Sequence, residues 1–175
     1  RLPRLSNFTD FSPLERIEGV GVRYAGAPEQ LEGADLILLP GTKSTLADLK
    51  WLRESGMEAQ LLKRHAAGVP VFGVCGYQMM GRAVSDPENT EGGGVMRGLG
   101  LLPVETVFRP VKTTAQASGA FGTVGGVLRG LSGAGASGYE IHMGETARDA
   151  GALPLIRLTR ADGTSFWDGC QADSA

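Results

Sequence analysis

The chain of 175 residues is long enough for one domain that buries about two-thirds of the surface its unfolded form would expose. Its net charge of −2 gives no electrostatic case for nucleic acid or an anionic membrane, and no apolar run reaches the roughly 18 residues of a membrane span. The two cysteines, Cys75 and Cys170, make neither a disulfide framework nor a metal set, so we expect a cytoplasmic protein with no metal site.

The first predicted elements are two strands and a helix. Residues 19–26, GVGVRYAG, alternate apolar and polar side chains as an edge strand does. Residues 34–41, ADLILLPG, form a continuous apolar run ending in Pro-Gly, which is typical of a strand buried on both faces. Ser44 or Thr45 can then cap a helix whose leucines recur at helical spacing and which Gly56 ends.

The alternation of strand and helix continues through the first half of the chain. Residues 57–68, MEAQLLKRHAAG, predict a short helix that ends at Gly68. Residues 69–75, VPVFGVC, predict another buried strand, and residues 77–84, YQMMGRAV, a helix after it. Alternating strands and helices of this kind favour a parallel sheet covered on both faces.

The character of the sequence changes after this point. Glycine-rich connections separate β segments, which we place at 98–108, 112–118, 137–146 and 154–160. Residues 85–94 and 132–138 are the expected mobile loops. The predicted fold class is therefore α/β, with a mostly parallel sheet, flanking helices and an added β section.

Cys75 stands where a predicted strand meets a predicted helix. A strand, a tight turn carrying the nucleophile and an immediate helix form a nucleophile elbow. Free N–H groups at a helix N-terminus favour a thiolate there. The amide of Gly76, with one from the Gly41–Thr42 turn, can donate to a developing oxyanion. Unpaired cysteine is also among the most often buried residues, so the pattern alone leaves a packing role open.

Five stretches then stand out in order along the chain: RLPRLSNFTDFSPL, ADLILLPGTKSTLADLKWLR, VFGVCGYQMMG, GLGLLPVETVF and GYEIHMGET. Together they resemble the glutamine amidotransferase portion of the cobyric acid synthase family, from residue 1 to residue 146. SNFTDF and GYEIHMGET are specific to that family. PGTKST and the cysteine elbow are shared with related class I glutamine amidotransferases.

The resemblance implies a class I glutamine amidotransferase fold with flavodoxin-like layers and a step in cobalamin biosynthesis. The family amidates carboxylates of a corrinoid, with glutamine as nitrogen donor and ATP with Mg²⁺ as activator. No G-x-x-x-x-G-K-[ST] phosphate loop is present here. We therefore expect residues 1–175 to be a single glutamine amidotransferase domain without a cofactor of its own, part of a longer chain whose N-terminal synthetase domain holds the corrinoid, ATP and Mg²⁺.

The resemblance also implies roles for individual residues. Cys75 becomes the nucleophile that attacks the glutamine side-chain amide and forms a glutamyl thioester. Gly41, Thr42 and Gly76 supply the oxyanion and substrate site. Gln78 contacts the glutamine, although a plain helix-forming role is equally compatible with its position.

The chain departs from the family pattern at two places. The family has Cys-Gly-Gly-Tyr-Gln, whereas residues 75–78 read Cys-Gly-Tyr-Gln, so either the turn is distorted or a residue is missing; the fit of the flanking residues favours the second. The family's general base is a histidine in a Tyr-Leu-His-Gly context near the C-terminus, and no such motif is present. We therefore expect residues 1–175 to lack their own general base.

The two histidines of the chain receive other interpretations. His65 lies near the end of a predicted helix and is expected to be structural. In the segment 138–146, alternation places Glu140 and His142 on one face of a strand, where they form a carboxylate–imidazole pair at the strand end. This pair is expected to support the catalytic groups without contacting the substrate, to brace the domain or to line the ammonia exit.

Two alternatives to a corrinoid-linked glutaminase remain. In the first, the segment is a catalytically silent module that docks on a synthetase. In the second, it is a glutaminase that serves the amidation of a cell-wall lipid precursor. The first would explain the single glycine and the absent histidine. The second shares the elbow and the Pro-Gly turn, but not SNFTDF and GYEIHMGET.

Overall fold

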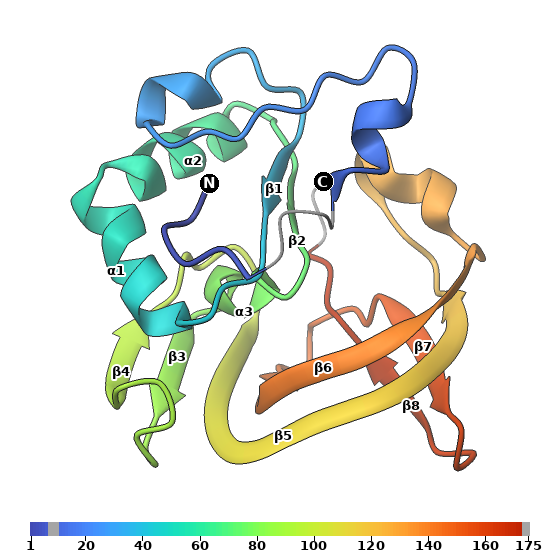
Figure 1. Cartoon of the computed structure of the whole chain (residues 1–175). Coiled ribbons are helices and arrows are strands. Elements are labelled where there is room, and N and C mark those ends of the chain that lie inside the picture. Colours follow the sequence, from blue (N-terminus) through green and yellow to red (C-terminus); the bar gives the residue numbers. More distant parts are fainter. Residues whose placement is uncertain (7–10, 173–175) are drawn as a thin grey trace. The chain divides into compact units, whose positions relative to one another are not determined.

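The computed structural model describes residues 1–6 and 11–172. The chain divides into two compact units, Arg1–Met79 and Met80–Ala175 (Figure 1). Residues 7–10, which carry most of the SNFTDF motif, lie outside the described residues.

The first unit contains a short parallel sheet and its helices. β1 (Ile37–Leu39) pairs in parallel with β2 (Val71–Gly73). The helical elements are the 3₁₀ turns η2 (Leu14–Arg16) and η3 (Pro28–Leu31), the helices α1 (Thr45–Glu54) and α2 (Met57–Ala66), and the single turn α3 (Tyr77–Met80), which runs to the boundary of the unit. Figure 1 shows α1 and α2 on one side of the β1–β2 pair.

The core of this unit confirms the helices that the leucine spacing predicts. Leu49 and Leu52 of α1 are 0% and 2% exposed, and Leu61 of α2 is 2% exposed. α2 ends two residues before Gly68, which has a φ of +93°, a conformation that glycine adopts at little cost. β1 is also confirmed, although it is shorter than the predicted strand, and the side chains of β2 are half-buried where full burial was expected.

Two predictions for this part of the chain are wrong. Residues 19–26 pair with no strand in the described part of the chain; their backbone makes local bonds, such as Gly26 N–H to the Gln30 side chain at 2.7 Å. Alternating side chains do not make a strand unless another strand accepts its backbone groups. The helix predicted for 77–84 ends at Met80, because the next residues turn into a strand.

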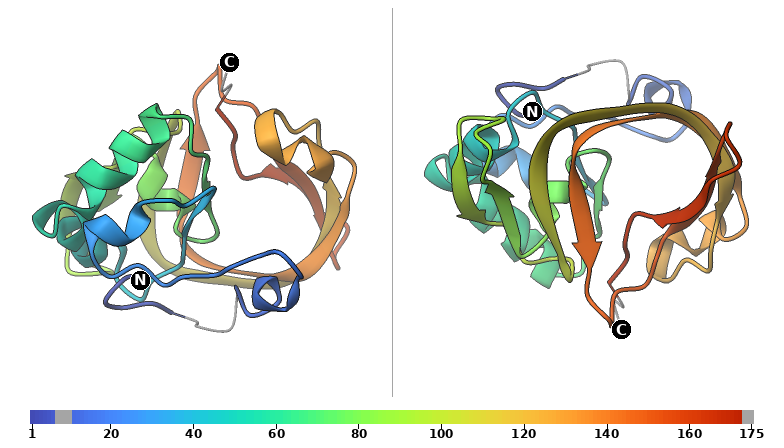
Figure 2. Two further views of the ribbon diagram at one scale, coloured as in Figure 1. Left: turned by 90° about the horizontal axis from the view of Figure 1, so that it is seen from above. Right: turned by 90° about the horizontal axis from the view of Figure 1, so that it is seen from below.

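The second unit is built on one six-stranded sheet. Its strands are β3 (Ala83–Asp86), β4 (Gly94–Arg97), β5 (Val104–Phe121), β6 (Gly135–Arg148), β7 (Ile156–Arg160) and β8 (Ser165–Asp168), with the 3₁₀ turn η4 (Gly126–Leu131) between β5 and β6. The order is β4-β3-β5-β7-β8, and β6 pairs with β5. Figure 1 and both views of Figure 2 show β5 curving along its length with β6 beside it.

Strand direction corrects the predicted fold class. β3 pairs with β5 in parallel, whereas the pairs β3–β4, β5–β6, β5–β7 and β7–β8 are antiparallel. The prediction of a mostly parallel sheet therefore holds for the β1–β2 pair and not for the six-stranded sheet, so the fold is α/β with a mixed sheet. The added β section, by contrast, forms most of the second unit.

Local chemistry explains the boundaries of these strands. The strand predicted for 98–108 begins only at Val104. The β5–β6 register shifts between Val107 and Lys112, where Pro110 has no N–H to donate to the ladder. The predicted loops are shorter than expected, because residues 85–86 belong to β3, residue 94 to β4 and residues 135–138 to β6.

Candidate active site

Cys75 follows β2 in a backbone conformation that side chains rarely adopt. Its φ is +58°, and the residue is exposed. The Gly76 N–H donates to the Val74 carbonyl at 2.6 Å, which closes a three-residue turn with Cys75 at its centre. Such strain costs about 1–3 kcal/mol and persists only where the surroundings impose it. The sharp turn expected of a nucleophile elbow is therefore present.

The end of β1 imposes this conformation. The Val74 N–H donates to the Leu39 carbonyl at 3.1 Å. A Cβ added to Gly76 would lie 2.3 Å from the Pro40 carbonyl oxygen and 2.6 Å from that of Leu39. Because these are backbone atoms of the sheet, no side chain fits at residue 76.

Gly41 brings a second backbone segment against the sulfur. A Cβ on Gly41 would lie 2.8 Å from Cys75 Cβ and 3.0 Å from Cys75 Sγ. Ser6 Oγ lies 3.0 Å from the same position. The structure thus brings together three of the predicted residues: Cys75, Gly76 and Gly41.

The amides of this site differ in whether they are already bonded. The Gly76 N–H, predicted to be an oxyanion donor, is committed to Val74. The N–H groups of Gly41 and Thr42 meet no acceptor within residues 1–6 and 11–172. Gly41 is buried and Thr42 is half-buried, and buried amides are nearly always paired, so these two donors are available to a ligand oxygen beside the cysteine.

Gln78 lies one turn beyond the cysteine. Its backbone N–H donates to the Cys75 carbonyl at 3.3 Å, and the residue is 7% exposed. It therefore supports the start of α3, and its predicted contact with glutamine stays a prediction.

A buried carboxylate that the sequence reasoning missed lies behind the Gly41–Thr42 turn. Asp48 of α1 is 0% exposed and accepts hydrogen bonds from the Thr42 hydroxyl at 2.6 Å, the Arg4 backbone N–H at 3.1 Å and Arg4 Nη1 at 3.0 Å. The Gly41 carbonyl in turn accepts from the Ser6 N–H at 3.1 Å. The turn is thus held from both sides by the segment at residues 4–6 and by α1.

The predicted pair of Glu140 and His142 lies in the second unit, in the middle of β6 and not at its end. His142 Nε2 is 2.8 Å from Glu140 Oε1, and His142 Nδ1 is 2.9 Å from the Gly144 carbonyl oxygen. Both ring nitrogens therefore face acceptors. Both nitrogens thus lie within hydrogen-bond distance of oxygen atoms of the same cluster, so neither is directed at another group.

Arg160 of β7 completes this cluster. Its guanidinium donates two bonds of 2.8 Å to Glu140, from Nε and from Nη2, in the bidentate geometry typical of this pair. These bonds are the main reason that the pKa of the Glu140 carboxyl is lowered, against a smaller opposing effect of burial. Arg160 also lies over the Phe166 ring, 4.5 Å from its centroid.

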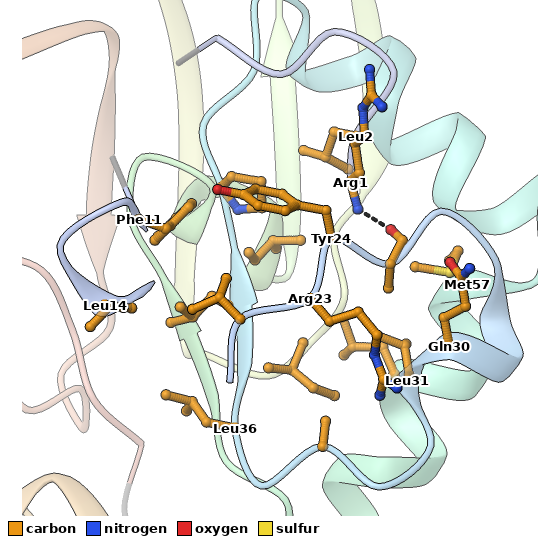
Figure 3. A pocket seen from close by; sticks show the side chains of 18 of the residues that line it. Arg1, Leu2, Phe11, Leu14, Arg23, Tyr24, Gln30, Leu31, Leu36 and Met57 are labelled. Carbon is orange, nitrogen blue, oxygen red and sulfur yellow. Dashed lines mark hydrogen bonds between the residues drawn. The ribbon is translucent and has the colours of Figure 1, made fainter. Parts of the chain in front are cut away.

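A cavity of about 710 Å³ in the first unit is a poor glutamine site (Figure 3). It is bordered by residues 19–25 and by β1, and most of its lining is apolar, as the labelled Leu2, Phe11 and Leu31 illustrate. Cys75 does not line it. Within the described residues we also find no group of His, Cys, Asp or Glu that can hold a metal ion, and no helix long and apolar enough to cross a membrane.

Comparison with known proteins decides the family. A family model described as the CobB/CobQ-like glutamine amidotransferase domain matches residues 1–175. The chain belongs to this family. It is a glutamine amidotransferase domain, as the motifs around Cys75 predicted.

Curated relatives of this amidotransferase domain carry the name cobyric acid synthase. The protein from Ruminiclostridium cellulolyticum is 47% identical over 175 residues, which cover 98% of this chain and 34% of that protein. The protein from Lachnoclostridium phytofermentans is 53% identical over 147 residues, 83% of this chain and 29% of that protein. The chain thus spans about a third of the length of these relatives.

A solved structure supports the fold. A chain described as a glutamine amidotransferase superposes with a TM-score of 0.55, covering 84% of this chain and 72% of the other at 22% sequence identity. At that identity the likeness concerns the fold alone.

Proposed function

We propose that this domain performs the glutaminase half-reaction of cobyric acid synthesis, with Cys75 as the nucleophile. The observation that carries the proposal is the strained, exposed Cys75, whose sulfur packs against the Gly41 backbone at the end of a parallel strand pair. Strained backbone of this kind clusters at active sites. The family membership adds the substrate, glutamine.

The reaction follows from acyl-transfer chemistry. The Cys75 sulfur attacks the side-chain amide carbon of glutamine, a C–S bond forms, and the carbonyl electron pair moves onto oxygen. That oxyanion accepts hydrogen bonds from the Gly41 and Thr42 amides. The carbonyl then re-forms and the C–N bond breaks, as the nitrogen takes up the proton that the Cys75 thiol has lost and leaves as ammonia. Water hydrolyses the resulting thioester to glutamate and the free thiol.

The oxyanion site proposed here differs in one respect from the sequence-based expectation. The Gly76 amide donates to Val74, so the open donors are those of Gly41 and Thr42. One oxyanion donor typically contributes about 100- to 1000-fold in rate. We therefore assign this contribution to the Gly41–Thr42 turn.

None of the groups described above is assigned as the general base. Both nitrogens of His142 are engaged by oxygen atoms, which argues against a base role for this ring. The resemblance implies a histidine in a Tyr-Leu-His-Gly context for this step, and residues 1–175 contain no such motif. We propose that Glu140 and His142 brace the second unit.

The destination of the ammonia rests on the relatives. Their name, cobyric acid synthase, and their threefold greater length support a longer polypeptide in which ammonia amidates corrinoid carboxylates at the expense of ATP, with Mg²⁺ held outside this domain. The family match runs through both units, which supports one amidotransferase domain over residues 1–175.

One observation favours a second candidate, a silent docking module. A single glycine, Gly76, follows the cysteine. Its N–H already donates to the Val74 carbonyl within the turn, so one expected oxyanion donor is not available. A module of this kind would keep the fold and the docking surface without turning over glutamine.

The test measures ammonia release from glutamine by the intact polypeptide. Cys75→Ala is expected to reduce release to background, and a diazoketone analogue of glutamine is expected to alkylate Cys75. Cys170→Ala is the matched control, because this cysteine is 7% exposed and burial raises the pKa of its thiol. Unchanged release in Cys75→Ala would refute the proposal, and a wild-type protein that releases none would establish the silent module.

A further inference from the structure

We infer that Asp48 is a positioning residue of the glutaminase site, which it serves by holding the Gly41–Thr42 turn against Cys75. The inference rests on the proposed function, because it assigns Asp48 an effect on the rate at Cys75. Asp48 itself contacts Thr42 and Arg4 and not the sulfur.

The burial of Asp48 is the first observation. It lies on the buried face of α1 among leucines, and its side chain is 0% exposed. A carboxylate in such a place is costly unless hydrogen bonds and a countercharge satisfy it. Three donors from outside α1 do so, and all three come from Arg4 or Thr42. The carboxylate thus ties the two segments that flank the cysteine to one helix.

The Thr42 hydroxyl shows how the turn is fixed. Its single hydrogen has three oxygen atoms in reach: Asp48 Oδ2 at 2.6 Å, the Arg4 carbonyl at 3.2 Å and the Ser44 carbonyl at 3.5 Å. The shortest contact is also the one to a charged acceptor, so the hydrogen goes to Asp48. The same hydroxyl oxygen accepts the Ser44 N–H at 3.1 Å. Without Asp48 the hydroxyl has two weaker acceptors to choose from.

The peptide between Gly41 and Thr42 is the part that matters for catalysis. Its carbonyl accepts from the Ser6 N–H at 3.1 Å, and the neighbouring Lys43 N–H donates to the Arg4 carbonyl at 3.0 Å. A trans peptide is planar, so fixing the carbonyl also fixes the direction of the Thr42 N–H. Arg4, which Asp48 holds through both backbone and side chain, anchors the segment at residues 4–6 that makes these contacts.

The site tolerates only a small displacement of its backbone donors. The space between Gly41 and Cys75 would not hold even a methyl group, and oxyanion donors work only within about 0.5 Å of their productive position. A carboxylate that sets the position of this peptide therefore acts on the transition state more than on binding of glutamine.

The test compares substitutions of nearly equal shape in the intact polypeptide. Asp48→Asn keeps the size of the side chain but replaces one acceptor by a donor, which faces Thr42 or Arg4. Thr42→Val removes the hydroxyl, and Thr42→Ser keeps it. We expect Asp48→Asn and Thr42→Val each to lower kcat for glutamine hydrolysis roughly 10- to 100-fold with KM within about twofold, while Thr42→Ser retains activity.

Three further measurements separate positioning from folding. The double variant Asp48→Asn/Thr42→Val is expected to lose less than the product of the two single losses, because both substitutions remove the same Thr42–Asp48 hydrogen bond. Glu54→Gln is the control on the same helix, since the Glu54 side chain is 65% exposed, and it should match the wild type. Far-UV circular dichroism gives the folded fraction of each variant.

The outcomes are distinct. Loss of kcat in proportion to the unfolded fraction, or unchanged kcat in both single variants, would overturn the positioning role while wild-type hydrolysis upholds the proposed function. A wild-type protein with no Cys75-dependent ammonia release would refute the proposed function, and this inference with it.

Discussion

The backbone at Cys75 is strained, and the backbone at Gly41 and Gly76 is closely packed. The cysteine has a φ of +58°, and both Gly41 and Gly76 lie where a Cβ would meet other atoms at 2.8 Å or less. Each feature is unfavourable for folding taken alone. Together they place a sulfur beside two amides that meet no acceptor in the described part of the chain, an arrangement suited to acyl transfer from glutamine.

Gly41→Ala tests this arrangement directly. The new methyl group would lie 2.8 Å from Cys75 Cβ and 3.0 Å from its sulfur, so the turn or the cysteine must move. We expect ammonia release to fall at least about 100-fold, because a displacement near 1 Å has such an effect on positioned groups. Gly21→Ala is the matched control, since no atom lies within 4 Å of its added Cβ. Wild-type kcat in Gly41→Ala would contradict the proposed oxyanion site.

Residue patterns predicted part of this site. The strand–turn–helix pattern predicted Cys75 and Gly76 as site residues, and the Pro-Gly turn predicted Gly41. Asp48 also left a signal, because Thr45, Asp48, Leu49 and Leu52 form one buried helical stripe with a charge inside it. Its partner Arg4 left none: a contact between residues that are 44 positions apart depends on the tertiary fold.

Among the strands and helices, too, features set by nearby residues were predicted, whereas features set by contacts between distant residues were not. The leucine spacing predicted α1 and α2, and apolar runs predicted β1 and β2. The parallel direction of β1 and β2 was also predicted, whereas the mixed directions of the six-stranded sheet were not, because alternation of side chains is the same in parallel and antiparallel strands. Residues 19–26 have the alternation of a strand and no partner in the described part of the chain.

The polar cluster that links β6 and β7 leads to a prediction about the stability of the second unit. Glu140, whose side chain is 8% exposed, joins His142 on its own strand to Arg160 on β7. Glu140→Gln keeps the shape and removes the charge, so the second unit should lose about 1–3 kcal/mol of unfolding free energy at pH 7. The measurement is urea unfolding followed by circular dichroism.

The pH dependence of this loss has a definite sign. The pKa of the Glu140 carboxyl is lower in the folded protein, mainly through the Arg160 bonds, so its stabilisation is present above the unfolded pKa and disappears as pH falls through the folded one. The difference between wild type and Glu140→Gln should therefore shrink on acidification below about pH 4. Glu88→Gln, at an ion pair about 45% exposed, should cost under about 1 kcal/mol. A Glu140→Gln difference that stays constant with pH would contradict this account.

At the scale of the whole molecule, two compact units match one family over residues 1–175. The first contains the cysteine elbow on a parallel strand pair, and the second is a mixed sheet with its own polar cluster. Relatives about three times as long support the view that ammonia made here is used elsewhere in a larger polypeptide.

Rapid-quench mass spectrometry of the intact polypeptide during glutamine turnover tests the central claim most directly. If Cys75 is the nucleophile, a glutamyl thioester accumulates on the peptide that carries it and is absent from Cys75→Ala. Ammonia release with no adduct on Cys75, or with the adduct on Cys170, would contradict the account.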